Sequence, residues 1–282
     1  MKLLVVATAL LTLLAVLALY LRQRLRALPN AKKKVLLKQT LNGVFIWFEQ
    51  RGLLPRTPAI RHDYLRDYPR LKTLEDNADV VRAECLSLLQ IKDKLTDMTK
   101  MGGSYTQEGI HTAKWKTFMF KSGKFVEQNC ELCPKTAAIL RTIPGLYTAF
   151  FSILEPHQYV TPHWGYYKGF QRYHLGVIIP NDNADRKCFL RVNGNLEDNS
   201  RRDLSLVENG ETYYWKNGEG VLFDDNYLHD AENGSDEVRV ILWLDLRRKM
   251  PFYLQAFNML CLAVAFRDES VKRIRENSLI EH

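Results

Sequence analysis

Residues 172–179 read Arg-Tyr-His-Leu-Gly-Val-Ile-Ile, and this stretch indicates the class of fold. In an extended strand, successive side chains point to opposite faces. Alternation therefore places Arg172 and His174 on one face, with Gly176, and Tyr173, Leu175 and Val177 on the other. The stretch predicts a strand that carries one polar face within an otherwise apolar sequence.

A second predicted strand, Val-Arg-Val-Ile-Leu-Trp-Leu at residues 238–244, places Arg239 on the same face as Ile241 and Trp243. An arginine in such surroundings is costly to bury without an anion, and its planar fork matches a carboxylate bidentately. We interpret Arg239 as the partner of a carboxylate co-substrate. The obvious candidate is 2-oxoglutarate, whose keto acid end can chelate iron.

Two histidines lie at the ends of separate predicted strands. They are His163 in the sequence His-Trp-Gly and His229 at the end of Phe-Asp-Asp-Asn-Tyr-Leu-His. Imidazole suits Fe(II), and non-haem oxygenases commonly use two histidines and one carboxylate, which leaves positions open for co-substrate and O₂. The usual carboxylate lies two residues after the first histidine, but Gly165 stands there and cannot bind a metal. The pattern predicts an iron oxygenase and leaves its third ligand open.

Several motifs in fixed order, between about Leu71 and Lys249, resemble the aspartyl/asparaginyl β-hydroxylases together with the lipid A 2-hydroxylases. The motifs are Leu-Glu-Asp-Asn at 74–77, Leu-Cys-Pro-Lys-Thr at 132–136, Arg-Tyr-His-Leu-Gly at 172–176, Asp-Asp at 224–225 and Ala-Glu-Asn at 231–233. These families are Fe(II)/2-oxoglutarate dioxygenases. The resemblance implies an α+β fold with a double-stranded β-helix (jelly-roll, cupin-like) core and flanking helices.

The resemblance also implies roles for single residues. It implies that His163 and His229 are the catalytic iron ligands and that 2-oxoglutarate and O₂ are the co-substrates. The residues it places against 2-oxoglutarate are Trp115, Ser152, Arg172, His174 and Arg239. Packing is the alternative role for Trp115 and His174. Asp224 and Asp225 either support His229 or form a turn.

The amino-terminal region indicates a membrane. Residues Leu3 to Leu21 are uncharged, almost wholly apolar and long enough to cross a bilayer, and basic residues follow at once. Residues 1–48 hold eight lysines and arginines and no acidic residue, which equals the formal charge of +8 of the whole chain. This distribution favours a membrane surface and not nucleic acid as partner. No motif indicates an obligate protein partner.

The basic cluster after the apolar segment places the carboxyl-terminal domain on the cytoplasmic side of a membrane, or on the equivalent side of an organellar one. A signal peptide cleaved near residues 16–18 is the alternative. The five cysteines, an odd number, fit a reducing compartment. The Cys130 and Cys133 pair has redox-motif spacing, but no thioredoxin-like pattern surrounds it, so we interpret the pair as structural.

The predicted organisation has four parts: a transmembrane anchor at 1–21, a basic juxtamembrane and interfacial segment at 22–70, the hydroxylase domain at 71–250, and a carboxyl-terminal amphipathic helix and tail at 251–282. Within the domain, helical spacing runs over residues 71–100, a helix is expected near 134–141, and residues 193–211 are expected to form a loop. Two apolar segments, 41–48 and 252–266, could lie in the membrane interface, although the second could instead pack on the outside of the barrel.

The sequence therefore predicts a membrane-anchored Fe(II)/2-oxoglutarate-dependent dioxygenase that hydroxylates an unactivated carbon. The anchor favours a membrane lipid acyl chain as substrate. Gly165 favours a peptidyl aspartate or asparagine instead, because the peptidyl branch of the resembling family also has glycine at this position, with water as the third ligand. A non-catalytic membrane scaffold is the third interpretation, and the complete set of two histidines and two arginines argues against it.

Overall fold

The computed structural model describes residues 30–101 and 114–280, and the chain divides into two compact units. The larger, which we call the barrel unit, consists of Thr57–Tyr166, Phe170–Arg248 and Val264–His282. The smaller, which we call the helical unit, consists of Met1–Arg56, Tyr167–Gly169 and Lys249–Ala263.

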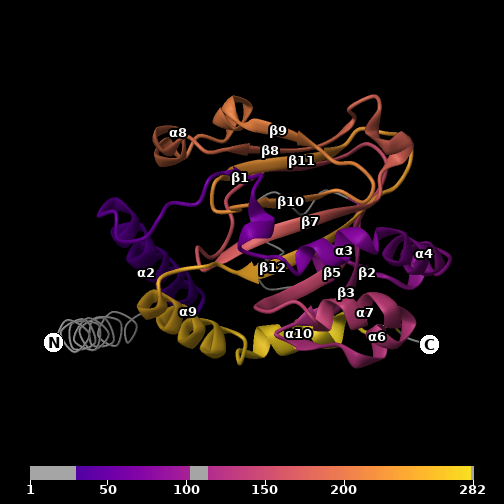
Figure 1. Cartoon of the computed structure of the whole chain (residues 1–282), viewed down its shortest axis with the longest axis horizontal. Helices are drawn as coiled ribbons and strands as arrows, with labels where there is room; N and C mark the ends of the chain where they lie inside the picture. The colour runs from indigo at the N-terminus through magenta and orange to yellow at the C-terminus, as the bar shows by residue number, and fades with distance from the viewer. Residues whose placement is uncertain (1–29, 102–113, 281–282) are drawn as a thin grey trace. The chain divides into compact units, whose positions relative to one another are not determined.

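The barrel unit contains two antiparallel sheets (Figure 1). The large sheet has the order β1-β10-β7-β12-β5-β3-β2, with β4 paired to β3, and the small sheet has the order β6-β11-β8-β9. The strands of the large sheet are β1 (Ile60–Arg61), β2 (Thr96–Asp97), β3 (Trp115–Ser122), β4 (Lys124–Phe125), β5 (Leu146–Leu154), β7 (Phe170–Ile178), β10 (Gly220–Phe223) and β12 (Arg239–Arg247). The strands of the small sheet are β6 (Gln158–His163), β8 (Cys188–Asn193), β9 (Glu211–Tyr214) and β11 (Leu228–Asn233).

The connectivity of β5 to β12 is that of a jelly roll. The chain passes from one sheet to the other at every step along these strands except between β8 and β9. The result is a core of two four-stranded antiparallel sheets, β5-β12-β7-β10 and β6-β11-β8-β9. The predicted α+β class with a jelly-roll core is confirmed.

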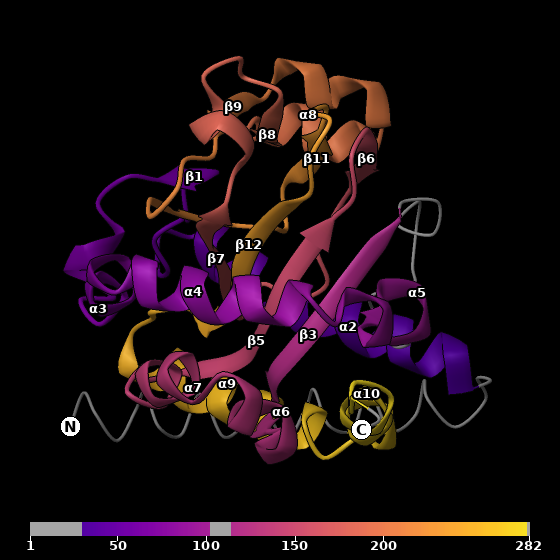
Figure 2. The ribbon, with the colours of Figure 1, turned by 90° about the vertical axis from the view of Figure 1, so that its right-hand side faces the viewer.

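The alternation predicted for residues 172–179 is also confirmed. Tyr173, Leu175 and Val177 belong to a buried cluster on the outer face of the large sheet, which includes residues of the helices that cover that face. Figure 2 shows α4 and α7 crossing this face. The helices of the barrel unit are α3 (Leu71–Asp76), α4 (Ala78–Leu89), α5 (Met98–Met101), α6 (Glu127–Leu132), α7 (Pro134–Arg141), α8 (Leu196–Arg201) and α10 (Glu269–Asn277), with short 3-10 turns at Tyr64–Arg66, Lys92–Lys94, Pro180–Asn183 and Leu204–Asn209.

The inner face of the large sheet carries a second buried cluster that is rich in aromatic residues. It includes Phe150, Trp215, Phe223 and Trp243, together with residues of the small sheet. Arg239 lies on β12, as Trp243 does, and His174 lies on β7 with its ring centroid 4.9 Å from those of Phe223 and Trp243. The polar face read from the sequence therefore looks into the space between the two sheets.

The prediction of a loop over residues 193–211 is wrong. The segment contains α8 and a 3-10 helix at Leu204–Asn209. The Asn195 side chain accepts hydrogen bonds from the backbone N–H groups of two residues at the start of α8, and Asp203 accepts one at the start of the 3-10 helix. Polar residues that suggested a loop are therefore helix caps.

The expected helix near 134–141 is confirmed as α7, which begins at Pro134, where a proline needs no backbone N–H partner. All five cysteines are free thiols, and burial raises the pKa of Cys130 to about 11. Cys130 and Cys133 both belong to the outer buried cluster.

The helical unit contains α2 (Asn30–Gln50) and all but the last two residues of α9 (Phe252–Ala265). The carboxyl-terminal segment predicted as an amphipathic helix and tail contains two helices, α9 and α10. Over residues 30–101 and 114–280, no helix combines the length and apolar character needed to cross a membrane. The predicted transmembrane segment at 1–21 lies outside the described residues.

Candidate functional site

The structure brings His163 and His229 together at one end of the small sheet. His163 ends β6, His229 is the second residue of β11, and the two are direct register partners. Their ring centroids are 4.2 Å apart with an interplanar angle of 51°. Both side chains are buried. The antiparallel pairing of β6 with β11 thus holds two imidazoles next to one another, although 66 residues separate them in the sequence.

Each histidine has its Nδ1 fixed by the backbone. Nδ1 of His163 lies 2.7 Å from the carbonyl oxygen of Thr161, and Nδ1 of His229 lies 2.8 Å from that of Tyr227. Because a carbonyl only accepts, Nδ1 carries a proton in both rings, and in the neutral form of each ring Nε2 is the nitrogen that has a lone pair. Burial, and then the neighbouring His163, hold the pKa of His229 well below its usual value. Neutral imidazole with a free Nε2 lone pair is the form that binds a metal ion.

The carboxylate of Asp225 occupies the space into which a side chain at Gly165 would point. A Cβ on Gly165 would lie 2.2 Å from Oδ2 of Asp225 and 2.6 Å from its backbone oxygen, which already accepts a hydrogen bond from the Gly165 N–H. Only glycine fits here. Across the described residues, no three His, Cys, Asp or Glu side chains are arranged to hold a metal ion. Asp225 therefore lies beside the histidine pair and does not complete a three-ligand set.

The two aspartates before His229 have different surroundings. Oδ1 of Asp224 accepts from the backbone N–H of Asn226 at 3.0 Å, and Oδ2 accepts from the hydroxyl of Thr57. Asp224 thus forms a turn. Oδ2 of Asp225 lies 2.9 Å from Nη1 of Arg172. Of the two roles that the sequence left open, Asp224 takes that of the turn, whereas Asp225 forms an ion pair with Arg172. Nδ1 of His229 is held by the carbonyl of Tyr227.

Arg172 makes contacts with two buried carboxylates. Besides Asp225, its Nε lies 2.9 Å from Oδ1 of Asp245, and its guanidinium carbon lies 3.9 Å from the ring centroid of Trp243. Two negative charges therefore balance this guanidinium within the protein. Its predicted contact with 2-oxoglutarate stays a prediction.

Arg239 is a buried cation that has no anionic partner among the described residues. It is 2% exposed, and its Nε and Nη1 have no hydrogen-bond partner within that part of the chain. The guanidinium carbon lies 4.7 Å from the ring centroid of Trp215, whose Nε1 also lacks a partner. Burial lowers the pKa of Arg239 to about 10. Since a buried charge is costly unless it is paired, these groups fit a site that takes up an anionic ligand.

His174 is a third buried histidine of the candidate site. Neither of its ring nitrogens has a hydrogen-bond partner in residues 30–101 or 114–280. Its ring centroid lies 4.9 Å from those of Phe223 and Trp243. The centroid of Phe223 lies in turn 5.7 Å from that of His229. Burial, followed by the nearby arginines and His229, lowers the pKa of His174 well below its usual value. His174 is therefore neutral and has both donor and acceptor capacity to offer a ligand.

Trp115 and Ser152 also face the interior. The indole Nε1 of Trp115 on β3 donates to Oγ of Ser152 on β5 at 2.9 Å, and both side chains are buried. Ser152 is the register partner of Ile241 on β12, two residues from Arg239. All five residues predicted to contact 2-oxoglutarate thus belong to the inner face of the large sheet. Trp215 was not predicted, because nothing in its local sequence distinguishes it from a core aromatic.

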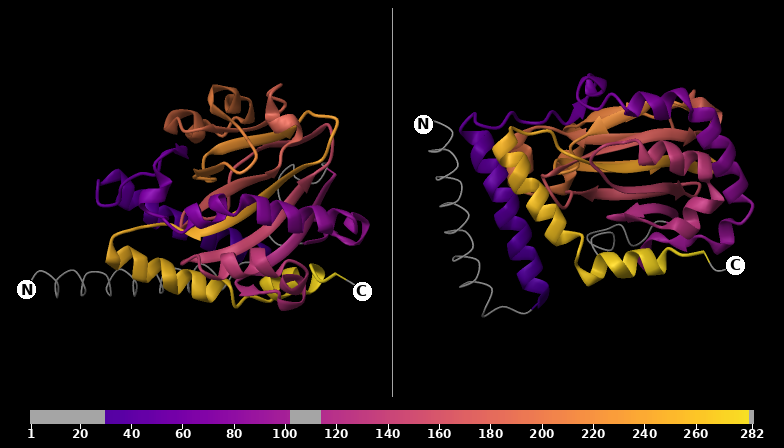
Figure 3. Two further views of the ribbon diagram at one scale, coloured as in Figure 1. Left: turned by 45° about the vertical axis from the view of Figure 1, so that its right-hand side comes forward. Right: turned by 60° about the horizontal axis from the view of Figure 1, so that its bottom comes forward.

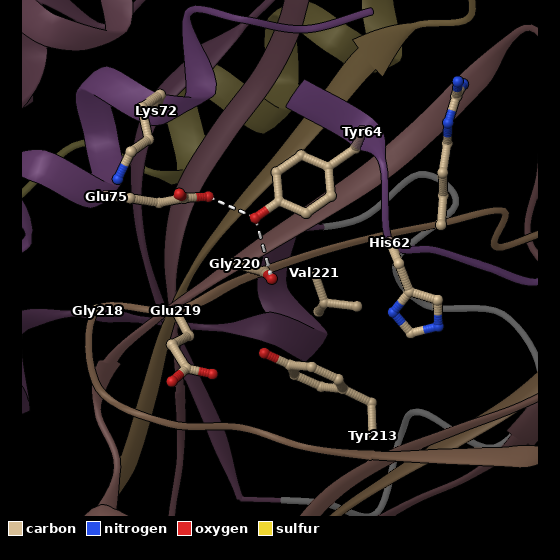
Figure 4. A pocket seen from close by; sticks show the side chains of 10 residues that line it. His62, Tyr64, Lys72, Glu75, Tyr213, Gly218, Glu219, Gly220 and Val221 are labelled. Carbon is tan, nitrogen blue, oxygen red and sulfur yellow. Dashed lines mark hydrogen bonds between the residues drawn. The ribbon is translucent and has the colours of Figure 1, made fainter. Parts of the chain in front are cut away.

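A pocket of about 390 Å³ lies elsewhere, at the end of β10 (Figure 4). The hydroxyl of Tyr64 donates to Glu75 at 2.5 Å, and the hydroxyl of Tyr173 donates to the same oxygen at 3.0 Å. The lysine and arginine in the pocket wall already have carboxylate partners, Lys72 with Asp76 and Arg61 with Asp63 and Asp67. None of the seven residues predicted to bind iron or 2-oxoglutarate lines it. The Leu-Glu-Asp-Asn motif, which supplies Glu75, therefore has a structural role here.

Comparison with known proteins gives a family match. The model of the family "Aspartyl/Asparaginyl beta-hydroxylase" matches residues 75–249. The chain is 33% identical over 179 residues to the ornithine lipid ester-linked acyl 2-hydroxylase of Rhizobium tropici. The aligned region covers 63% of this chain and 57% of that relative. It is also 30% identical over 203 residues to the mouse (Mus musculus) aspartate beta-hydroxylase domain-containing protein 2. That aligned region covers 68% of this chain and 51% of the mouse protein. The match thus spans little more than half the length of each relative.

Proposed function

The chain belongs to the aspartyl/asparaginyl β-hydroxylase family, a family of 2-oxoglutarate-dependent hydroxylases, and we propose that it is a membrane-anchored enzyme that hydroxylates a lipid acyl chain. The observation that carries the proposal is the buried guanidinium of Arg239. It has no anionic partner among the described residues. Its guanidinium carbon lies 4.7 Å from the ring centroid of Trp215, which lies 5.9 Å from that of His174.

In this proposal, Nε2 of His163 and Nε2 of His229 hold Fe(II). Iron and 2-oxoglutarate, when bound, supply with O₂ the oxidising power to place a hydroxyl group on an unactivated carbon, with succinate and CO₂ as co-products. The carbonyls of Thr161 and Tyr227 fix the tautomer of the two rings, so Nε2 of each ring would be the nitrogen that offers a lone pair to a metal ion.

The remaining side chains orient the co-substrate. The Arg239 fork binds a carboxylate of 2-oxoglutarate, with His174 and the Ser152 hydroxyl as further hydrogen-bonding groups. Arg172, held by Asp225 and Asp245, keeps a positive charge close to the histidine pair without being free to rotate. The aromatic side chains between the sheets exclude water, which strengthens each of these polar contacts.

A lipid acyl chain is the substrate that we favour. The similarity to an ornithine lipid ester-linked acyl 2-hydroxylase supports an ester-linked acyl chain, and the apolar segment at 3–21 would hold the enzyme at the bilayer in which such a substrate lies. We propose that the protein crosses the membrane once, with its catalytic domain on the cytoplasmic side, because basic residues follow that segment. A peptidyl aspartate or asparagine is the second candidate, which Gly165 favours.

The test is a reconstitution of the full chain in vesicles made from cellular lipid extract, with Fe(II), 2-oxoglutarate and O₂. We expect mass spectrometry to find acyl lipids that have gained one oxygen atom, together with an equal amount of succinate. The His229→Ala variant is the matched control and should produce neither. Hydroxylation of aspartyl or asparaginyl peptides without any oxidised lipid would favour the second candidate. Absence of succinate with both substrate classes would support the scaffold interpretation and overturn the proposal.

A further inference from the structure

The helical unit exposes far more apolar surface than its size predicts. Six of the twelve large apolar side chains that are exposed among the described residues belong to it, although it makes up only about a fifth of those residues. They are Ile46, Trp47, Leu53, Phe252, Met259 and Leu260. An apolar surface of this density on a folded protein marks a site of interaction.

Helix α9 is apolar on both of its faces. Its 14 residues include no charged side chain. Leu254, Phe257 and Leu262 are buried, whereas Phe252, Met259 and Leu260 are exposed. A helix that is hydrophobic all round requires an apolar environment on each side. Since 14 residues rise only about 21 Å, less than the roughly 30 Å of a hydrocarbon core, such a helix lies along a membrane and does not cross it.

Contacts within the helical unit join α2 and α9 into one body, as Figure 3 shows. The ring of Phe45 on α2 lies 5.8 Å from that of Phe257 on α9 and 5.9 Å from that of Tyr167. The hydroxyl of Tyr167 donates to Oδ1 of Asn258 at 2.9 Å, and Asn258 Nδ2 donates to the carbonyl of Gly169 at 2.9 Å. The exposed apolar residues of the two helices thus belong to a single packed structure.

The charge of the helical unit identifies the partner. The unit has twelve lysines and arginines and a single acidic residue, Glu49, which gives a formal charge of +11, whereas the remainder of the chain has −3. Glu49 itself lies 3.3 Å from Nζ of Lys168, and both side chains are nearly buried. Exposed apolar side chains combined with an excess of basic residues are the features of a helix that binds an anionic bilayer surface.

We propose that α2 and α9 form a membrane-contact face that lies in the headgroup region of an anionic bilayer, with the side chains of Trp47, Phe252, Met259 and Leu260 inserted. This face acts in addition to the apolar segment at 3–21. The inference deepens the proposed function and rests on it in one respect, since the face brings the enzyme to a lipid substrate. The helical unit also includes Tyr167–Gly169, which begins four residues after His163 in the sequence.

The test is a spin label at Leu260 in the full chain. Cys261 is first replaced by alanine, which leaves four buried cysteines, and a nitroxide is attached to Leu260→Cys. The control is Leu204→Cys in the barrel unit, because Leu204 is 48% exposed and Leu260 57%. With vesicles that contain phosphatidylglycerol, we expect the label at Leu260 to show several-fold higher access to O₂, and lower access to a water-soluble nickel chelate, than the label at Leu204.

The other outcomes overturn the proposal. High access to the nickel chelate at Leu260 would show that α9 faces water. Low access to both reagents would show that protein covers the label, for example the apolar amino-terminal segment of the chain itself. The measurement requires no turnover, so its failure is distinct from a failure of the proposed enzymatic function. Replacing phosphatidylglycerol by phosphatidylcholine should reduce the O₂ access at Leu260, and an unchanged value would contradict the role of the basic residues.

Discussion

Replacement of Arg239 by methionine is expected to have opposite effects on the free protein and on the co-substrate complex. Methionine keeps an unbranched side chain of comparable length and removes the guanidinium. In the free protein, Nε and Nη1 of Arg239 have no hydrogen-bond partner in the part of the chain that the structure describes, so no described residue compensates the buried charge. In the complex we propose, the same group holds a carboxylate. The substitution should therefore stabilise the free protein and abolish its stabilisation by 2-oxoglutarate.

The expected stabilisation of the free protein can be calculated from the lowered pKa of Arg239. Burial lowers the pKa of Arg239 to about 10, from the ordinary 12.5. Since one pKa unit corresponds to about 1.4 kcal/mol, the cost of the buried charge is on the order of 3 kcal/mol. The folded pKa lies below the unfolded one, so this cost is fully present at neutral pH and is relieved only as the pH rises through about 10. Loss of the contact with the Trp215 ring offsets roughly 1 kcal/mol, and a net gain of about 2 kcal/mol is expected.

The size of the second effect follows from the ion pair. Loss of a buried charge-assisted pair costs about 2 to 5 kcal/mol, which corresponds to a roughly 30-fold to several-thousand-fold weaker affinity for 2-oxoglutarate. At 2-oxoglutarate concentrations about 100 times the dissociation constant, the wild-type protein should gain about 2.7 kcal/mol of stability. The Arg239→Met variant should gain almost none at the same concentration.

Urea unfolding at neutral pH, with and without 2-oxoglutarate, measures both effects. The matched control is Arg191→Met. Arg191 forms a two-point contact with Asp230, at 3.2 and 2.6 Å. Its removal leaves the buried carboxylate of Asp230 without its cation and with only the hydroxyl of Tyr159 as donor, and should destabilise the free protein by about 3 kcal/mol. The control should keep its response to 2-oxoglutarate. An Arg239→Met protein that is less stable than wild type, yet equally stabilised by 2-oxoglutarate, would refute the assignment of an anion site to Arg239.

Three further expectations address the metal site, the edge pocket and the corrected loop. His163→Ala and His229→Ala should each abolish Fe(II) binding, measured by equilibrium dialysis, and succinate formation, while the far-ultraviolet circular dichroism stays that of wild type. Tyr64→Phe should lower the free energy of unfolding by about 1 kcal/mol, because it removes one buried hydrogen bond, and should leave the affinity for 2-oxoglutarate unchanged; a weaker affinity would assign the pocket to the active site. Asn195→Ala should cost about 1 kcal/mol in urea unfolding through loss of the helix cap, and an unchanged stability would show that α8 does not depend on that cap.

The sequence was sufficient for the jelly-roll strands because their pattern is local. A period of two is visible within residues 172–179 and 238–244, and a strand that carries both a polar and an apolar face must lie between two layers. The same reading located the pair of histidines and the arginine on the interior. Helix α7 was predictable for a similar reason, since Pro134 marks its first turn.

The features that could not be predicted from the sequence depend on contacts between segments that are distant in the chain or on the local backbone conformation. The balance of charge on Arg172 comes from Asp225 and Asp245, which are 53 and 73 residues away and have no pattern that links them to it. The segment at 193–211 was wrongly predicted as a loop because Asn and Asp are equally common as turn residues and as helix caps. Only the backbone around Asn195 decides which role applies.

The absence of a carboxylate at position 165 follows from the packing of Asp225. Oδ2 of Asp225 lies where a side chain at Gly165 would begin, and it is the same atom that lies 2.9 Å from Nη1 of Arg172. An aspartate at position 165 would bring a second negative charge into that space. Arg172 could not balance it, because its Nε is already held by Asp245.

The Gly165→Asp variant is therefore expected to bind iron more weakly and to be less stable than wild type, although its residue types match the usual set of two histidines and one carboxylate. The like-charge repulsion and the clash with the side chain both arise from Asp225, so the double variant Gly165→Asp, Asp225→Gly should remove these two and place one carboxylate two residues after the first histidine. The backbone oxygen of residue 225 remains 2.6 Å from the new Cβ, so we expect the double variant to recover only part of the loss. Isothermal titration with Fe(II) under anaerobic conditions compares the three proteins. If the single variant bound iron more tightly than wild type, the position would be open to a ligand, and glycine would not be required by the packing of Asp225.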